Sequence, residues 1–221
     1  MKLRRLDIKG FKSIDGVIGQ SLALGDLTVL LGANGSGKSN LLAFFEMLRC
    51  MAKQELAGFV GKHGASRLLF YGPKFTNSIV FKAFFDDGAE SIYEVELKPR
   101  LPEGLFINYE KIDFGQYDPQ TRENFQKTIH RGEDGELLLS DFYYLPKNQR
   151  GESGLAYDGN ETGQLIHAFL SDVHIYQFND TSETAKIKDR GYVDDARFLR
   201  RDAGNLAAFL KMLKGYMTTT Q

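Results

Sequence analysis

The sequence has little cysteine and no long apolar run, and each shortage excludes a class of protein. Cys50 is the single cysteine among 221 residues, so an intrachain disulfide and a cysteine-based zinc site are excluded. No apolar run approaches the roughly 18 residues of a membrane-spanning helix. Charged residues are spaced through the first seven positions, which leaves no apolar signal core. We therefore expect a cytoplasmic protein with no membrane partner.

Net charge is also nearly absent. The 28 basic and 29 acidic residues give a formal charge of −1. This excludes a nucleic-acid-binding protein whose whole surface is basic. A local basic patch is still allowed, and Arg197, Arg200 and Arg201 form the best cluster, either as a nucleic-acid contact or as a solvated face. The length of 221 residues predicts one large domain, or one with an inserted lobe, and the hydrophobic fraction of 42% is typical of a globular protein.

The first fifty residues predict strand, loop, strand, glycine loop and helix. Leu6 and Ile8 alternate with polar neighbours, as in a half-buried strand. The apolar run 27–31 predicts a strand buried on both faces. Beyond the glycines, apolar residues from Leu41 recur at helical spacing, which predicts an amphipathic helix running to about Lys53.

The middle of the chain predicts antiparallel β structure, and helices return near the end. The pattern predicts a hairpin at 78–85 and 91–97, shorter β runs at 105–109 and 137–139, a loop at 146–163, and helices at 165–170 and around 206–213. The class is therefore α/β or α+β with mixed sheets.

One segment carries a specific chemical motif. Gly32-Ala33-Asn34-Gly35-Ser36-Gly37-Lys38-Ser39 matches G-x-x-x-x-G-K-[ST] at every fixed position, between an expected strand and an expected helix. Glycines let the backbone curl round a phosphate, while successive N–H groups and the helix N-terminus face the anion. Lys38 would reach the β- and γ-phosphates, and the Ser39 hydroxyl would bind Mg²⁺. The motif predicts a nucleotide phosphate site.

Four stretches together resemble a known family. They are 6–14, the loop extended through Asn40 to Leu42, 176–182 and 199–210, and they resemble ABC-type ATPases of the RecF, SMC and OLD group, most closely the bacterial "AAA family" predicted ATPases. The resemblance implies ATP and Mg²⁺ as ligands. It also implies that Lys12 approaches the nucleotide and that Asn34 and Asn40 belong to the site.

The resemblance further implies a P-loop NTPase of the ABC-ATPase head type. Its α/β fold would have a central mixed sheet with flanking helices, plus an antiparallel β subdomain. We expect the chain to be one N-terminal portion of such a head, with the P-loop core at about 1–60 and 165–221 and the β-rich lobe at about 75–145.

Three elements of this family are missing from the sequence: an apolar strand ending in Asp-Glu, a signature loop resembling Leu-Ser-Gly-Gly, and a switch histidine. We therefore expect the remaining part to be absent or supplied by another chain, and this chain to be inactive by itself. In relatives two heads sandwich ATP, so the resemblance implies a second head (a homodimer) or a C-terminal part as partner. The family's usual work is DNA repair, chromosome handling or phage defence, with DNA as a further partner.

Two alternatives from other classes remain open. The chain could be a nucleotide-sensing assembly subunit that does not hydrolyse ATP, which the missing Asp-Glu strand favours. It could also be a small-molecule P-loop kinase, although about thirty residues precede the loop and kinases tend to begin almost at that strand. The four histidines lie too far apart in the sequence to indicate a metal site.

Overall fold

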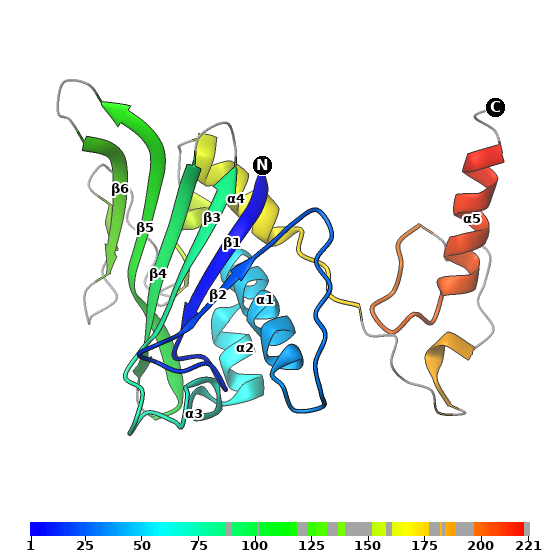
Figure 1. Ribbon diagram of the computed structural model, residues 1–221, viewed down its shortest axis with the longest axis horizontal. Helices are drawn as coiled ribbons and strands as arrows, with labels where there is room; N and C mark the ends of the chain where they lie inside the picture. Colours follow the sequence, from blue (N-terminus) through cyan, green and yellow to red (C-terminus); the bar gives the residue numbers. More distant parts are fainter. Residues whose placement is uncertain are drawn as a thin grey trace. The chain divides into compact units, whose positions relative to one another are not determined.

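A computed structural model describes residues 1–86, 90–100, 102–118, 123–131, 137–139, 152–157, 161–176, 182, 184–188 and 197–218. The chain forms two compact units, Met1–Val173 and His174–Gln221, and each is described by itself. Figure 1 shows the first unit as a sheet backed by helices. In the part of the chain that is described, no helix is both long enough and apolar enough to cross a bilayer.

The first unit is built on a seven-stranded sheet. The strands lie in the order β2 (Gln20–Ala23), β1 (Lys2–Lys9), β3 (Ile79–Asp86), β4 (Glu90–Arg100), β5 (Gly104–Asp118), β6 (Glu123–Arg131) and β7 (Leu137–Leu139). The expected hairpin is confirmed as β3 and β4, paired from Ile79↔Leu97 to Asp86↔Glu90. Every described pairing is antiparallel, so the expected mixed sheet is not found among the described residues.

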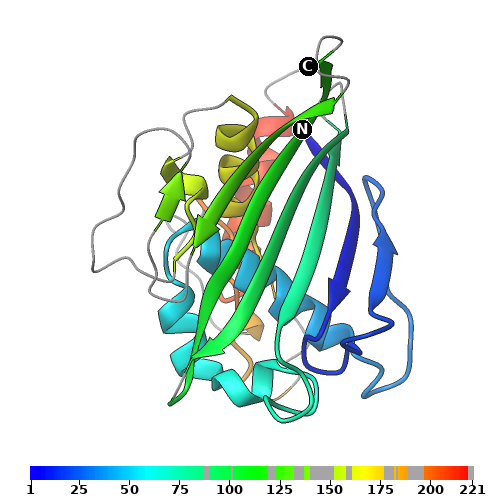
Figure 2. The same cartoon turned by 90° about the vertical axis from the view of Figure 1, so that its left-hand side faces the viewer.

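Helices cover one face of this sheet, as Figure 2 shows with the opposite face toward the viewer. They are α1 (Lys38–Ala52), α2 (Leu56–His63) and α4 (Glu161–Ser171), with the short α3 (Ala65–Leu68) and the 3₁₀ helix η2 (Leu155–Tyr157). The expected helix that ends near Lys53 is confirmed, because Lys53 is the C-cap of α1. The helix expected at 165–170 is confirmed within α4.

A chain of aromatic rings joins α1 to the centre of the sheet. Phe11, Phe44, Phe81 and Tyr93 meet edge to face, with successive centroids 5.1, 5.4 and 5.8 Å apart. All four residues are at most 1% exposed. Such pairs contribute about 0.5–1.5 kcal/mol each beyond the burial of their area. The helix that follows the glycine loop is thus fixed to the sheet near its first turns.

A bulge in β1 explains which of its residues face the core. Leu3, Leu6 and Ile8 are all buried, although a regular strand would place Leu3 and Leu6 on opposite faces. The register shifts between Leu3 and Arg5, so one extra residue lies between them. The bulge therefore turns three apolar side chains to the same face.

A second bulge, in β5, turns a carboxyl group into the core. Leu97 lies opposite Ile107 whereas its neighbour Glu96 lies opposite Tyr109, so β5 has one extra residue there. As a result Ile107 and Glu110 both point inward, and both are fully buried. Alternation alone could not place Glu110 in the core, because it assumes an unbroken pleat.

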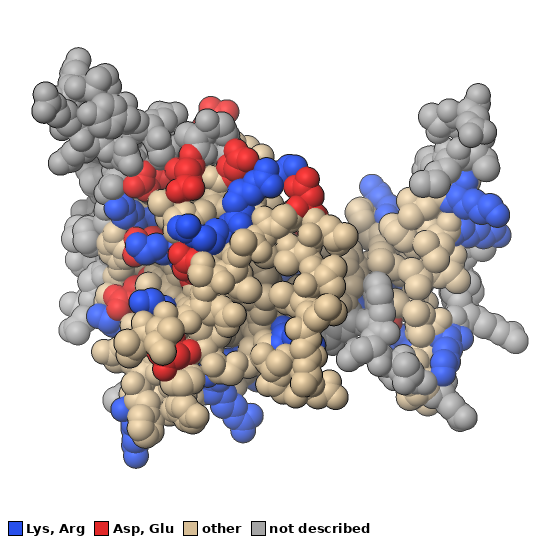
Figure 3. All heavy atoms as spheres, viewed as in Figure 1, with Lys and Arg blue, Asp and Glu red and all other residues tan. Residues whose placement is uncertain are grey.

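The expected buried strand at 27–31 is wrong for this structure. Leu27, Val29 and Leu31 are 85%, 69% and 90% exposed, and the segment has no strand conformation. A strand obtains its hydrogen bonds and burial from neighbours, and among the described residues no strand lies beside this one. The segment is instead part of the connection from β2 to α1. The surface there has few charged residues, as the middle of the first unit in Figure 3 shows.

The loop expected at 146–163 ends earlier than predicted, because α4 begins at Glu161, and part of it is buried. Residues Glu152 to Leu155 are buried. The two Glu152 carboxylate oxygens accept hydrogen bonds from Leu56 N–H and Ala57 N–H, each at 2.9 Å. A carboxylate at this position satisfies free donors of the first turn of α2 and favours its dipole. The segment therefore caps the N-terminus of α2 and holds it in place.

The second unit contains η3 (Lys186–Lys188) and α5 (Leu206–Thr218), which confirms the helix expected around 206–213. Just before α5, the buried Asn205 side chain accepts a hydrogen bond from Arg200 N–H and donates one to the Phe198 carbonyl. Asn205 thereby fixes the turn that presents Arg200 and Arg201. Of the family-like stretch 176–182, only Tyr176 and Ser182 lie among the described residues.

Candidate functional site

The glycine loop 32–37 lies immediately before α1 and contains a tight turn, in which Ser36 N–H donates to the Ala33 carbonyl at 3.2 Å. Gly35 and Gly37 have φ of 83° and 94°, in the left-handed region that glycine adopts readily. A Cβ atom on Gly32 would lie 2.7 Å from Ser36 Oγ, and one on Gly37 would lie 3.2 Å from Ser13 Oγ. Side chains at these positions would fill the cradle, so the loop geometry fits the glycines of the motif.

Lys38 folds back over this loop. Its Nζ donates hydrogen bonds to the carbonyl oxygens of Gly32 at 2.6 Å and Ala33 at 2.8 Å, and to Ser36 Oγ at 3.3 Å. The ammonium therefore lies at the mouth of the loop and is held by neutral oxygens, with no carboxylate among these three partners. A phosphate placed there would meet a compact cation together with the loop N–H groups.

The N-terminus of α1 is open toward an anion. Gly37 is its N-cap, no side chain caps it, and its first turn carries no acidic residue. The first N–H groups of a helix lack intrahelical partners and carry the positive end of its dipole. The arrangement of loop, Lys38 and helix end is therefore suited to binding phosphate.

Asn40 and Ser13 connect this loop to the segment that follows β1. Asn40 Nδ2 donates to Ser13 Oγ at 2.7 Å. Ser13 lines a hollow of about 370 Å³ together with Ser36, Gly37 and Lys38. It also lines a second hollow of about 640 Å³ together with Lys12 and Asn40. The Asn40–Ser13 hydrogen bond thus lies between two neighbouring cavities, and the structure brings Lys12 and the glycine loop together.

Lys12 is held in an unusual backbone conformation at this place. Its φ is 50°, and its N–H donates to the Leu68 carbonyl at 2.8 Å. Burial lowers the pKa of Lys12, while the charge of Glu46 acts in the opposite direction. A non-glycine residue in the left-handed region is uncommon and costs free energy, which is typical of functional sites.

The larger cavity also contains His63, at the end of α2. Burial lowers the pKa of His63 below its ordinary value, and the charges of Lys12 and Lys62 lower it further, against the opposing charge of Glu46. The lowered pKa favours the neutral imidazole. His63, Lys62 and the exposed Tyr71 were not identified from the sequence, because only the fold brings α2 and the connection to β3 beside Lys12.

The donor set for a metal ion is small. Among the described residues no three His, Cys, Asp or Glu side chains gather where they could hold a metal. The Ser39 hydroxyl, exposed in the first turn of α1, is the metal ligand that the motif predicts. Mg²⁺ keeps several waters and is often held through substrate phosphates with few protein ligands, so a single hydroxyl fits a Mg–nucleotide complex.

A buried polar cluster lies apart from the glycine loop, on the inner face of the sheet. Glu110 Oε1 accepts hydrogen bonds from Tyr93 Oη and Ser153 Oγ, both at 2.5 Å, and Glu110 Oε2 accepts one from Gly154 N–H at 2.8 Å. Glu110 and Ser153 are 0% exposed. The cluster ties the segment after Glu152 to the centre of the sheet.

We expect Glu110→Ala to lower the free energy of unfolding by about 3 kcal/mol, because three buried donors would lose their acceptor. Urea denaturation of the full chain measures this change. Glu94→Ala is the matched control: Glu94 lies on the other face of β4, 3.2 Å from Lys82, and its loss should cost less than about 1 kcal/mol. Equal destabilisation by the two variants would show that the cluster contributes nothing special.

The structure describes only some of the other candidates. Arg197, Arg200 and Arg201 belong to the second unit, where the Arg197 guanidinium lies 5.6 Å from the Phe198 ring centre. His167 Nε2 lies 3.0 Å from the Ala52 carbonyl in the first unit, in a structural contact. Asp87, Asp194, Asp195 and His130 lie outside the residues whose side chains are described.

An α/β unit with a glycine loop, a lysine at its mouth and an open helix end defines a P-loop ATPase of the AAA/ABC type. Comparison with protein families agrees: the profile of the family described as "AAA domain, putative AbiEii toxin, Type IV TA system" matches residues 27–210. This is well over half of the chain, and the protein belongs to that family. A comparison with curated proteins gives no match.

Proposed function

We propose that the chain binds Mg-ATP through residues 32–39 and supplies the phosphate-binding half of an ATPase of the RecF, SMC and OLD type. The observation that carries the proposal is the position of Lys38 Nζ, 2.6–2.8 Å from two loop carbonyls at the open N-terminus of α1. When ATP binds, we expect the ammonium to exchange these carbonyls for the β- and γ-phosphate oxygens. Asn34, Asn40 and Lys12 would contribute further contacts.

Hydrolysis requires groups beyond this loop. A carboxylate has to orient the attacking water, and further donors have to neutralise charge on the transferred phosphoryl group. We propose that these come from a second head, as a homodimer, or from a C-terminal part of the same enzyme. The exposed apolar residues Leu27, Val29 and Leu31 directly before the loop support this, because a partner strand there would bury them beside the nucleotide.

The biological role that we propose is DNA repair, DNA handling or phage defence, with ATP turnover driving a conformational cycle. The resemblance of 6–14 and 32–42 to the RecF, SMC and OLD group supports this role. A non-hydrolysing nucleotide sensor is the second candidate, and the missing strand ending in Asp-Glu favours it.

The test is calorimetric titration of the full chain with ATP, with Mg²⁺ and then with a chelator. Ser39→Ala should weaken ATP binding in Mg²⁺ by about tenfold, or 1.4 kcal/mol, and leave the metal-free affinity unchanged, because only the metal contact is removed. Ser21→Ala, on the edge strand β2, is the control. Equal loss with and without Mg²⁺ would contradict the metal role of Ser39, and no ATP binding by the unmodified chain would contradict the proposed function.

A further inference from the structure

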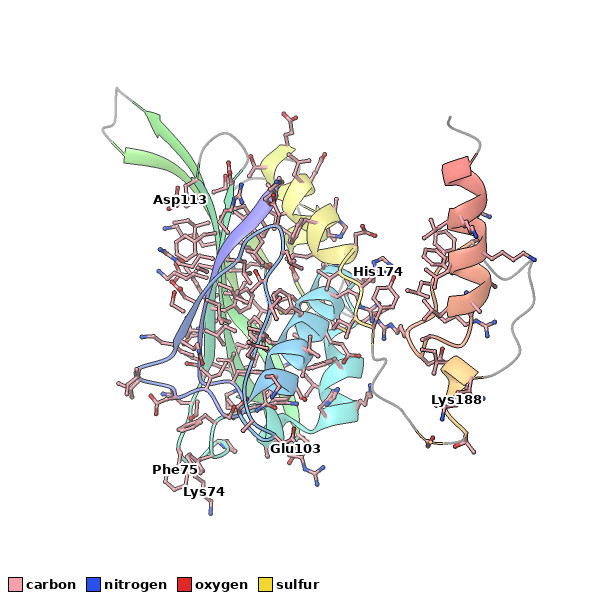
Figure 4. The ribbon with its side chains drawn as sticks, turned by 45° about the vertical axis from the view of Figure 1, so that its right-hand side comes forward. Lys74, Phe75, Glu103, Asp113, His174 and Lys188 are labelled. Atoms are coloured by element: carbon pink, nitrogen blue, oxygen red, sulfur yellow. The ribbon has the colours of Figure 1, made fainter. Side chains whose placement is uncertain are left out.

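A surface beside the larger cavity carries exposed aromatic and basic side chains, and two of them, Arg67 and Tyr71, line that cavity together with Lys12. Tyr71 is 76% and Phe75 is 80% exposed, and their ring centres lie 6.1 Å apart. Arg67 and Lys74 are exposed in the same short stretch of chain. Figure 4 shows Lys74 and Phe75 projecting from one end of the first unit. We call Arg67, Tyr71, Lys74 and Phe75 the aromatic–basic ridge.

The ridge is held rigidly, at a cost to the fold. Tyr71 has φ of 54°, in the left-handed region that a bulky residue rarely adopts. The turn is fixed by Phe75 N–H and Thr76 N–H, which donate to the Gly72 carbonyl at 3.1 and 3.0 Å, and by Thr76 Oγ1, which donates to the Phe70 carbonyl at 2.6 Å. Tyr71 therefore keeps an unfavourable backbone conformation while its aromatic ring is exposed to solvent, and such strain is typical of functional surfaces.

Hollows lie on both sides of Tyr71. The cavity of about 640 Å³ is lined by Lys12, Lys62 and Arg67. A smaller hollow of about 260 Å³ is lined by Lys9 and Phe75, and Tyr71 lines both hollows. A chain that crossed the ridge would thus meet an aromatic ring at the crest and cations on either side.

The charge of this surface is positive because its basic residues outnumber its acidic ones: Lys9, Lys12, Lys62, Arg67 and Lys74 against Asp15, Glu46 and Glu103. Asp15 accepts hydrogen bonds from two backbone N–H groups at 2.7 Å, and Glu103 accepts one from Ser66 Oγ at 3.0 Å. Glu46 lies 3.8 Å from Lys62. In the part of the chain that the structure describes, no carboxylate pairs with Arg67 or Lys74.

We propose that the aromatic–basic ridge binds single-stranded nucleic acid. Unpaired bases would stack on Tyr71 and Phe75, and the phosphates between them would meet Arg67 and Lys74. A duplex keeps its bases stacked upon each other, so the two rings favour a single strand. The proposal goes beyond ATP binding and stands on residues outside the glycine loop.

The experiment is fluorescence anisotropy of a labelled 20-nucleotide oligodeoxythymidylate with the full chain, in saturating Mg-ATP so that the nucleotide site is filled. The double variant Tyr71→Gly/Phe75→Ala should bind at least tenfold more weakly, because stacking on each ring is lost. Glycine at position 71 adopts the observed φ without strain, so the melting temperature should not fall for that reason. Arg67→Ala and Lys74→Ala should each reduce the slope of log affinity against log salt by about one.

The matched control is Phe198→Ala, which removes another exposed aromatic ring beside arginines, in the second unit. It should leave oligonucleotide binding unchanged. Calorimetric titration of the ridge double variant with Mg-ATP should give the affinity of the unmodified chain, so a failure of the ridge is distinguishable from a failure of the ATP site. The proposal is overturned if the unmodified chain does not bind the oligonucleotide, if the ridge variants bind it normally, if Phe198→Ala abolishes binding instead, or if a duplex of the same length binds as tightly.

Discussion

Lys38→Ala is expected to abolish tight ATP binding, with an affinity loss of about 100-fold or more. The alanine removes the single side-chain cation at the mouth of the loop, and a charge-assisted contact to phosphate contributes about twice as much as a neutral one. The loop carbonyls of Gly32 and Ala33, which Lys38 neutralises, would also face the phosphates directly. The loss of the cation and the exposure of the two carbonyls both weaken phosphate binding. Calorimetric titration with Mg-ATP measures the total loss of affinity.

Lys53→Ala is the matched control for this variant. Lys53 is an exposed lysine at the opposite end of the same helix, where it is the C-cap of α1. Its removal changes the net charge by the same amount and should leave the ATP affinity unchanged. Unchanged affinity in Lys38→Ala itself would remove the glycine loop from consideration as the nucleotide site.

The isolated 221-residue chain is expected not to hydrolyse ATP at an enzymatic rate. Phosphoryl transfer depends on positioning and on electrostatic stabilisation, and the described residues supply a phosphate cradle, one cation and one metal ligand. A head without a water-orienting carboxylate should be slower by about 10²–10⁴-fold. A sensor that binds ATP without turning it over would give the same result. The measurement that separates the two functions repeats the hydrolysis assay with the candidate partner head added, and an increase in the rate would indicate an ATPase.

A phosphate-release assay measures this rate, with Lys38→Ala as the control for contaminating ATPases. If several turnovers per minute by the isolated chain vanish in the variant, the water-orienting carboxylate is already present in this chain. One of the aspartates outside the described residues would then be the first to test.

The sequence predicted local elements well, because their signals are local. The apolar spacing from Leu41 and the alternation in the hairpin at 78–97 each depend on a few neighbouring residues, and both are confirmed. The pairing of β1 with β3 was not predictable, because the sequence of neither segment indicates which strand it pairs with. The error at 27–31 has the same origin: apolar composition indicates that a strand seeks burial, but burial depends on neighbours that this fold does not place there.

The glycine loop was found because a phosphate cradle needs consecutive residues. The Lys38 contacts show how that segment folds, and the roles of Ser39, Asn40 and Lys12 toward the nucleotide remain predictions. The cluster around Glu110 and the ridge at Tyr71 had no sequence signal, since the first depends on a bulge and the second on a left-handed backbone. Glu110 also contacts residues distant in the chain, whereas the ridge lies within one short stretch of it.

The order of the strands also has a consequence for how the protein folds. From β3 to β7 each strand pairs with the next one along the chain, so this meander requires only short loops to close. Pairing Ile8 with Phe81 instead closes a loop of about seventy residues that contains the glycine loop and α1. Because the entropy lost in closure grows with loop length, the meander can nucleate first and β1 joins it afterwards. We therefore expect the nucleotide site to be assembled late, on a sheet that has already formed.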